Sequence, residues 1–490
     1  MLKCNPFYSP VRRLFRRKPV NMYENPKIPL RNHQSRAARL RRFGHTLAFL
    51  AGFAGPLLAV SLPAGAQGFG LLQDTETERL LRSYEEPILK VAGIDPAAVH
   101  MYIVNDTELN AFVAEGQNIF SNAGLFIQLQ TPNELIGVLA HETGHMAGGH
   151  LSRGSDAMDK ASIPMLLSMI VGVGAMIAGA GEAGMVLMGL GQDVAMAQFL
   201  SFSRAQEATA DQMGQRYLRL THQSGMGMVN VFNRMANNMA RMVKNPERFA
   251  TSHPADRDRV ALMERIANES PYRDVPDSPA SVHAFRMVKA KVIGYLLPVR
   301  EVLDRYPAKD KSAEARYARA MVYLRQPNLS GAMSEIQSLI KEEPNNPYFQ
   351  EVLGQIYVSM GQPVKGVDPF RKAVSLLPDA PELRVSLAAA MIATERKDMS
   401  QPAIQQLKVA LQMDREQPFA WYELAQAYSD LGQTAQADLA TAELRYYNGN
   451  AQEAAMFALR ARQALPQGSP DWQHANDILA MVQNYLRQQR

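Results

Sequence analysis

The chain contains only one cysteine, Cys4, among its 490 residues. A single thiol cannot build a disulfide framework within the chain, and it cannot supply the group of thiolates that binds a structural metal. Such a low cysteine content suits an oxidising compartment, where a free thiol is a liability. Any metal site in this protein must therefore use histidine and carboxylate ligands.

Beyond residues 1–66 the chain also lacks an excess of basic residues. The net charge of +5 and the pI of about 9.1 would suit a nucleic-acid or membrane binder. Residues 1–66 hold 12 of the 52 Lys and Arg residues and one of the 47 acidic residues, which leaves 40 basic and 46 acidic residues after them. Since the body of the chain is mildly acidic, we expect no nucleic-acid partner.

Residues 1–66 are predicted to be an N-terminal extension that ends in a cleavable signal peptide. Four arginines between positions 36 and 42 precede the uncharged apolar stretch Thr46–Leu62, and the small residues Ala64-Gly65-Ala66 follow it. This order of a basic region, an apolar region and a small-residue site is typical of secretory signals. Cleavage after Ala66 would start an exported, cysteine-free chain at Gln67.

The next segments are predicted to be a helix and two strands. Apolar residues recur at helical spacing over Leu71–Val91, with acidic residues between them. Val99–Val104 and Ala111–Phe120 have the β-branched and aromatic content of strands. Glu115-Gly116 interrupts the second of these and predicts a turn or bulge there.

A helix with a well-marked start follows. Thr131 is predicted to cap it, Pro132 suits the first helical position, and Glu134 completes a capping box. The apolar run after Glu134 indicates that the helix belongs to the core. We expect it to extend at least to His145 and to stop at Gly148-Gly149.

This helix carries His141-Glu142-Thr143-Gly144-His145, an HExxH motif. Residues four apart share a helix face, so both imidazoles can reach one zinc ion. Glu142 lies about 100° around the helix, where its carboxylate can accept a proton from a water molecule. The motif predicts His141 and His145 as metal ligands and Glu142 as a catalytic base. Two surface histidines on a polar helix are the alternative, and the preceding apolar run argues against it.

A catalytic zinc site needs a third protein ligand and one open position. His150 is the nearest candidate, but the longer motif with three histidines requires one at position 151, which is Leu151. Glu207 and Asp211 lie four residues apart on a second predicted helix, so one can bind the metal while the other orients a ligand histidine. We expect Glu207 to be the third ligand, with His150 as the alternative.

His253, in the segment Thr251-Ser252-His253-Pro254, is a further candidate. A histidine before proline in a loop is most often structural, and Pro254 disfavours a helical conformation for it. A neutral imidazole is also a good zinc ligand, so His253 could fill the open position and hold activity low. The other functional reading is that it contacts the scissile carbonyl and assists catalysis.

The C-terminal part of the chain is repetitive. Asn268–Pro279 is rich in Pro, Ser and Asp and predicts a domain boundary. Small, aromatic and proline positions then recur after 34 residues: Ala320, Tyr323, Ala332, Ile336 and Pro344 correspond to Gly354, Tyr357, Gly366, Phe370 and Pro378. This spacing is typical of tetratricopeptide repeats, whose concave surface binds peptides and proteins. Looser units follow, and a generic array of helical hairpins is the alternative.

Three segments together resemble one peptidase family. They are the HExxH motif, the pattern SRxxExxAD over Ser203–Asp211, and the Ser-His-Pro sequence at 252–254 followed by Arg259. They are similar to the family of the CaaX prenyl proteases and heat-shock protein X, and they cover roughly residues 100–265. These motifs are specific, whereas the repeats are less so.

The resemblance implies Glu207 as the third ligand and one Zn2+ per chain, with Asp211 and Arg204 supporting the ligands. With the signal peptide and the repeats, it points to periplasmic members of the family. It then implies unfolded or stalled outer-membrane proteins as substrates, and the outer-membrane β-barrel assembly machinery as a partner of the repeats. The expected activity is a zinc-dependent endopeptidase with a chaperone-like role in outer-membrane protein assembly and quality control.

The expected fold is mostly α-helical with a small β-sheet: a zincin-like (gluzincin) metallopeptidase domain followed by an α-solenoid of tetratricopeptide repeats. The expected divisions are an extension with signal peptide at 1–66, the metallopeptidase domain at 67–270, a linker or connecting helix at 271–310 and the repeats at 311–490. An assembly scaffold or chaperone with a largely closed metal site is the alternative function.

Membrane attachment is a separate question. Ala161–Gly181 has no charged residue over 21 positions, long enough for a membrane span. A single crossing would put His145 and Glu207 on opposite sides of the bilayer, so we expect a buried helical hairpin and leave peripheral membrane contact open. A membrane-embedded peptidase and an uncleaved N-terminal anchor are the alternatives, and both Met1 and Met22 fit as the start.

Overall fold

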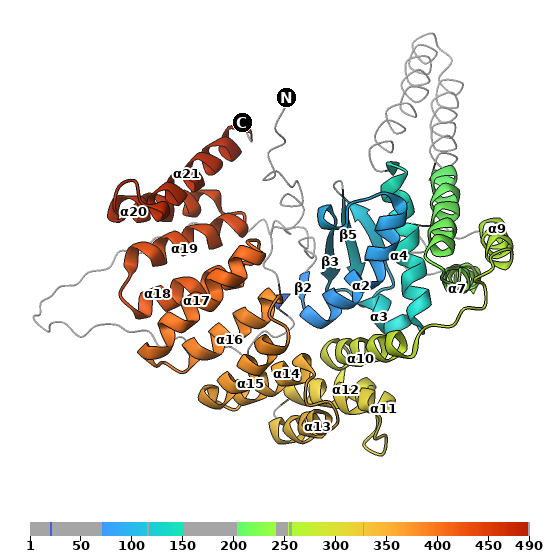
Figure 1. Ribbon diagram of the computed structural model, residues 1–490, viewed down its shortest axis with the longest axis horizontal. Coiled ribbons are helices and arrows are strands. Elements are labelled where there is room, and N and C mark those ends of the chain that lie inside the picture. Colours follow the sequence, from blue (N-terminus) through green and yellow to red (C-terminus); the bar gives the residue numbers. More distant parts are fainter. Residues whose placement is uncertain are drawn as a thin grey trace, which may run out of the picture.

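The computed structural model describes residues 20–21, 71–114, 117–150, 203–241, 253, 257–326 and 328–488. These residues are mostly helical and contain one small sheet, which confirms the predicted fold class (Figure 1). The predicted signal peptide and the predicted hairpin over 161–181 lie outside the described residues. Within the described ranges, no helix has both the length and the apolar character that crossing a membrane requires.

The sheet has five strands in the order β1-β2-β3-β5-β4. They are β1 Val20–Asn21, β2 Leu71–Gln73, β3 His100–Val104, β4 Ala111–Ala114 and β5 Asn118–Asn122. β4 and β5 pair antiparallel on either side of the predicted turn, whereas β3 and β5 run parallel. β4 is consequently an edge strand, and it packs against the helix that carries the HExxH motif.

The first predicted helix begins later than expected. Leu71 and Leu72 pair with β3 as strand β2, and only Thr75–Ala92 forms helix α2. Asp74 sets this start, because its carboxylate accepts a hydrogen bond of 3.0 Å from the backbone N–H of Thr77. An apolar pair suits a strand as well as a helix, so the cap decides the boundary.

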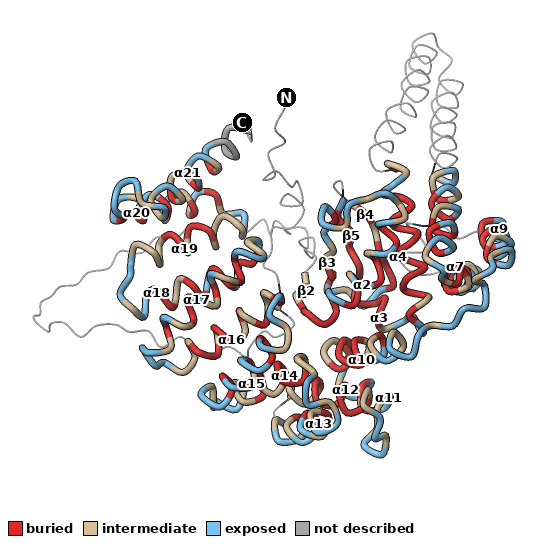
Figure 2. The backbone as a smooth tube through the Cα atoms, viewed as in Figure 1, coloured by how far each residue is buried: buried red, intermediate tan, exposed pale blue. Residues whose placement is uncertain are grey.

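Helices cover the sheet and complete the N-terminal half. Besides α2 they are α3 Gly124–Gln128, α4 Pro132–Ala147, helical residues 203–220, α7 Met226–Arg241 and α9 Arg257–Asn268. α4 packs between α2 and α7, and nearly all of its residues are buried (Figure 2). The catalytic motif therefore lies in the core of this half.

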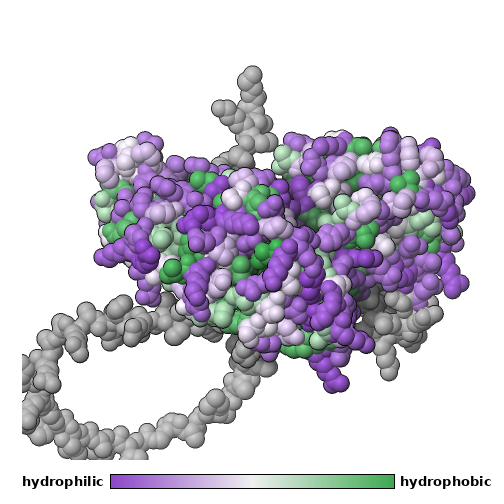
Figure 3. All heavy atoms as spheres, turned by 60° about the horizontal axis from the view of Figure 1, so that its bottom comes forward, coloured by the Kyte–Doolittle hydropathy of each residue, from purple (hydrophilic) through white to green (hydrophobic). Residues whose placement is uncertain are grey.

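The C-terminal half is an arc of paired helices (Figure 1). They are α12 Ala313–Leu324, α13 Leu329–Glu342, α14 Pro347–Ser359, α15 Pro363–Leu376, α16 Pro381–Ala393, α17 Lys397–Met413, α18 Pro418–Asp430, α19 Thr434–Tyr447, α20 Ala451–Ala464 and α21 Pro470–Gln488. The predicted small positions allow close helix contact, since a Cβ on Gly354 would lie 2.6 Å from the Phe370 ring. On the face drawn in Figure 3, hydrophobic residues are scattered among mostly hydrophilic ones.

Helix α10, Pro279–Leu296, belongs to both halves. One set of its side chains is buried in the core of the N-terminal half: Phe285, Val288 and Val292. Another set is buried in the core of the first repeats: Met287, Ala290 and Ile293. The segment predicted to be a linker or connecting helix, which also contains α11 Val299–Arg305, therefore contributes buried side chains to both cores.

Buried charges reinforce this junction. Lys291 of α10 is fully buried, and its Nζ lies 2.5 Å from Asp74 Oδ1 and 3.2 Å from Glu76 Oε2. The hydroxyl of Tyr317, in α12, donates a hydrogen bond of 2.7 Å to Glu76 Oε2. The Lys291 ammonium group thus links α10 to the start of α2. The hydroxyl of Tyr317 links the repeat helix α12 to Glu76, one of these two carboxylates.

Candidate active site

Thr131 caps α4 as the sequence predicts, whereas Glu134 accepts from the residue before the cap and not from the cap residue itself. Thr131 Oγ1 accepts a hydrogen bond of 3.2 Å from the backbone N–H of Glu134. The Glu134 carboxylate accepts in turn from the backbone N–H of Gln130, and Arg234 of α7 donates to the same carboxylate. The helix ends at Ala147 with Gly148 as its C-cap. These contacts fix the position of α4 and so the direction of the motif side chains.

Close approach of two backbones sets the distance between the two ligand-bearing helices. A Cβ on Gly144 would lie 2.7 Å from the carbonyl oxygen of Ala210, on the helix over 203–220. Only glycine leaves room for this contact. The pairs His141–His145 and Glu207–Asp211 therefore face each other across a short gap.

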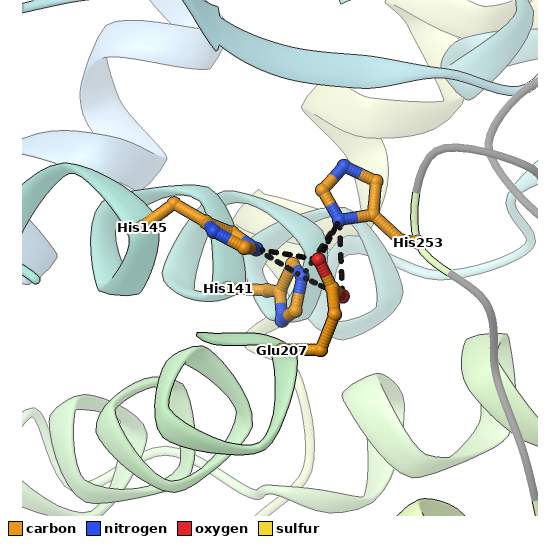
Figure 4. A group of neighbouring side chains, drawn as sticks. All are labelled: His141, His145, Glu207 and His253. Atoms are coloured by element: carbon orange, nitrogen blue, oxygen red, sulfur yellow. Dashed lines mark hydrogen bonds and ion pairs between the residues drawn. The ribbon is translucent and has the colours of Figure 1, made fainter. Parts of the chain in front are cut away.

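Four predicted site residues meet there (Figure 4). His141, His145, Glu207 and His253 are all buried, and each offers a ligand atom within 4.8 Å of the others. His141 Nε2 lies 3.1 Å from His145 Nε2 and 3.2 Å from His253 Nδ1. The Glu207 carboxylate lies 3.3 Å from His145 Nε2 and 3.1 Å from His253 Nδ1.

This donor set fits a metal ion. The nitrogens of three imidazoles point at one place, and two nitrogen lone pairs repel unless a proton or a cation lies between them. Histidine nitrogen and carboxylate oxygen are also ligands that zinc accepts. His141, His145 and Glu207 would hold the ion, and the His253 ring reaches the same place from a separate segment.

The electrostatic surroundings favour positive charge at this place. Burial alone would lower the pKa of His141, but the carboxylates of Asp211 and Glu207 outweigh it and raise that pKa to about 10. Burial would raise the pKa of Glu207, yet hydrogen bonds from the surrounding histidines hold it well below its ordinary value. Glu207 is therefore ionised and available to a cation.

Asp211 lies behind His141, as predicted. Its Oδ1 is 3.1 Å from His141 Nδ1, which leaves Nε2 of the same ring to face the cluster. The guanidinium of Arg259 donates to Asp211 at 2.8 and 2.9 Å and lies 3.1 Å from Glu207 Oε2. Arg204, which was predicted to support the ligands, is exposed, and Arg259 takes that place. Arg204 lies at the start of the described part of this helix, one turn before Glu207, and its side chain is exposed to solvent.

Two further side chains complete the surroundings. His150 is buried and places its Nδ1 2.9 Å from His145 Nδ1, on the side of the ring away from the cluster. It is therefore placed to orient His145 and not to join the ligands. Phe232 of α7, which no motif in the sequence singles out, packs against the His141 ring and under Arg259. Its only sequence signal is its place on the apolar face of an amphipathic helix.

Glu142 points its carboxylate into the same buried region. The side chain is fully buried, and neither oxygen has a hydrogen-bond partner among the described residues. His253 Nε2 is 3.6 Å from Glu142 Oε1. Such a buried carboxylate is costly unless a polar group meets it, and a water molecule beside the metal site would do so.

Comparison with known proteins agrees with this geometry. Residues 74–267 match the family model described as Peptidase family M48. This part of the chain is similar to that metallopeptidase family, and its buried cluster of histidine and glutamate residues could hold the metal ion that such a peptidase requires.

The similarity extends beyond the peptidase domain. The chain is 25% identical over 366 residues to the "Beta-barrel assembly-enhancing protease" of Yersinia pestis, covering 72% of this chain and 73% of that protein. It is 24% identical over 376 residues to the "Putative beta-barrel assembly-enhancing protease" of Vibrio cholerae serotype O1, covering 75% and 76%. The crystal structure of MamA, 20% identical, covers 35% of this chain and 95% of its own, with a TM-score of 0.26, too low to support a conclusion.

Proposed function

We propose that this protein is a zinc-dependent endopeptidase of the periplasm that acts in the assembly and quality control of outer-membrane proteins. The observation that carries the proposal is the meeting of His141, His145 and Glu207 beside the buried carboxylate of Glu142. The names of the relatives support the connection with β-barrel assembly, and the predicted signal peptide supports export.

Glu142 is the general base in this proposal. His141, His145 and Glu207 would hold a zinc ion, which would supply a Lewis acid and lower the pKa of a bound water to about 7. Glu142 accepts the proton of the attacking water and passes it to the leaving amine of the cleaved peptide bond. Asp211 and Arg259 keep His141 and Glu207 in position throughout.

An extended substrate would bind at strand β4. β4 is an edge of the sheet and packs on α4, so a peptide added along it would pass close to the motif. Main-chain hydrogen bonds to an edge strand require an extended backbone, which unfolded chains provide and native domains do not. Stalled or unfolded outer-membrane proteins fit this requirement. The repeats would bind the β-barrel assembly machinery.

The test uses the exported protein loaded with zinc and an unfolded substrate such as casein. Wild type cleaves it, whereas Glu142→Gln retains its zinc but loses about 10²- to 10⁴-fold in kcat, because the ligands remain and the base is lost. Glu86→Gln, a change at a partly exposed carboxylate of α2, is the matched control. Full activity of Glu142→Gln would exclude this mechanism.

His253 is proposed to hold the site closed until a substrate or partner displaces it. Its ring lies within hydrogen-bonding distance of both His141 and Glu207, where it would keep a water molecule from the metal site. His253→Ala should therefore cleave casein, or itself, faster than wild type. Slower cleavage by His253→Ala would instead indicate that His253 contributes to catalysis, and an unchanged rate would exclude both roles.

This closed arrangement also supports a second candidate function. An assembly scaffold or chaperone built on the repeats would need its metal site only rarely. The two functions differ in one result: the scaffold predicts that Glu142→Gln supports outer-membrane protein assembly as well as wild type does.

A further inference from the structure

Glu85 of α2 is a fully buried carboxyl group beneath the HExxH motif. α2 packs on α4, and Glu85 Oε1 is in hydrogen-bond contact with Oγ1 of Thr143, the third residue of the motif. Thr143 is also fully buried. Nothing in the reaction described above uses either side chain.

The hydrogen-bond count around Thr143 indicates which form of Glu85 is present. Thr143 Oγ1 lies 3.0 Å from the carbonyl oxygen of Leu139, one turn earlier in α4, as well as against Glu85. A hydroxyl has one hydrogen to donate, and a carbonyl and an ionised carboxylate can both only accept. If Glu85 is protonated, it donates to Thr143, and Thr143 donates to Leu139. All the contacts are then satisfied.

The charges around Glu85 agree with the protonated form. Glu85 Oε2 has no hydrogen-bond partner among the described residues. Among the described residues, Arg82 of α2 is the cation that acts on Glu85, and its guanidinium donates to the carbonyl oxygens of Pro96 and Val99. α4 contributes the buried carboxylate of Glu142. α10, β3 and η1 (Pro96–Ala98), which also pack on α2, add no further charge on Glu85 among the described residues.

Ionised Glu85 would thus be a buried anion beside another carboxylate. Both the burial of its charge and the repulsion between the two negative charges are unfavourable. Burial raises the pKa of Glu85 to about 8.

We infer that Glu85 is a positioning residue that is held as the neutral acid: it donates to Thr143 and so fixes the turn of α4 that carries His141 and Glu142. The neutral form also keeps a second negative charge away from the site. Peptide hydrolysis develops negative charge on the carbonyl oxygen of the substrate, so an added anion nearby would slow it. The catalytic part of this inference rests on the proposed function.

The first measurement compares kcat, KM and zinc content. Glu85→Ala should lower kcat about 10-fold or more with KM little changed, because a displaced catalytic group affects the chemical step. Glu85→Gln should restore most of that loss, since its amide N–H can donate to Thr143. Wild-type activity should decline above a pH of about 8, and this decline should be absent in Glu85→Gln. Equal losses in Glu85→Gln and Glu85→Ala, with zinc retained, would show that a carboxylate is required.

Thr143 gives a second route if the Glu85 variants fail to fold. Thr143→Ser keeps the hydroxyl and should keep most of kcat, whereas Thr143→Val, equal in size, should lose it. Equal activity of the two Thr143 variants would contradict the positioning role.

A second measurement does not depend on proteolysis. A carboxyl whose pKa is raised by folding binds more protons in the folded state, so its contribution to stability is lost as the pH rises from its unfolded pKa towards about 8. The melting temperature of Glu85→Gln should therefore rise relative to wild type across this interval.

Glu423 of α18 is the matched control, because burial raises its pKa to about 7 in the repeats. Glu423→Gln should shift stability in the same sense but leave the pH profile of activity unchanged. A melting-temperature difference for Glu85→Gln that does not vary with pH would overturn the neutral assignment, even if the protein cleaves nothing.

Discussion

Replacing Lys291 by methionine should destabilise the protein strongly, although the proposed reaction does not use this residue. The substitution keeps most of the side-chain volume and removes one ammonium group. Asp74 and Glu76 then remain buried beside each other without their cation. Glu76 keeps its hydrogen bond from Tyr317, but a hydroxyl group does not replace a charge.

The magnitude follows from the distances. At an effective dielectric constant of about 20, contacts of 2.5 and 3.2 Å correspond to attractions of roughly 7 and 5 kcal/mol. The cost of removing the ammonium group from water, several kcal/mol, offsets much of this sum. Loss of one partner of such a buried group typically costs about 3–5 kcal/mol, a large part of the 5–15 kcal/mol that usually separates folded from unfolded states.

Denaturant unfolding at pH 7 measures the change in the free energy of unfolding of Lys291→Met. Lys365→Met, at an exposed lysine of α15, is the control, and its free energy of unfolding should change by no more than about 0.5 kcal/mol. Adding Asp74→Asn and Glu76→Gln to Lys291→Met should recover most of the loss, because Asn can still cap α2. Burial already raises the pKa of Glu76, and loss of the nearby ammonium group raises it further, so the loss of stability should shrink as the pH falls. The reasoning is refuted if Lys291→Met behaves like Lys365→Met, or if the triple variant is no more stable than the single one.

Two further predictions concern the ligands and the division of the chain. Glu207→Ala should lower zinc occupancy, measured by metal analysis, far more than His150→Ala does, because His150 meets His145 at the ring nitrogen that faces away from the cluster; equal losses would return His150 to the ligand set. A chain that ends at Pro276 lacks α10, whose side chains are buried in the core around the HExxH motif. It should therefore bind zinc less well than a chain that ends at Leu296, and equal zinc binding would show that α10 is dispensable. Residues 311–490 alone should still give a helical circular dichroism spectrum.

The parts of the site that follow from helix geometry could be predicted from the sequence. Thr131 caps α4 as expected, and the spacing of the motif brings His141 and His145 to one face. The same spacing rule places Glu207 and Asp211 together. In each case the distance along the chain determines the distance in space.

The remaining contacts depend on how separate elements pack. Arg259 and Arg204 are equally plausible guanidinium donors in the sequence, and only packing places Arg259 against Asp211. Glu85 has no sequence signature, because an isolated glutamate in a helix looks like a solvated one. The Pro-rich segment before α10 indicates a boundary, but the sequence does not show that α10 itself contributes to both cores.

The contact between Gly144 and Ala210 has a consequence for how the motif itself tolerates change. In the formula HExxH the two unspecified letters stand for any residue. In this chain Gly144 leaves no space for a Cβ, and Thr143 is enclosed beneath the motif. Random replacement of the five codons, followed by selection for zinc binding, should therefore return the wild-type residue at position 144 almost as often as at the two histidines.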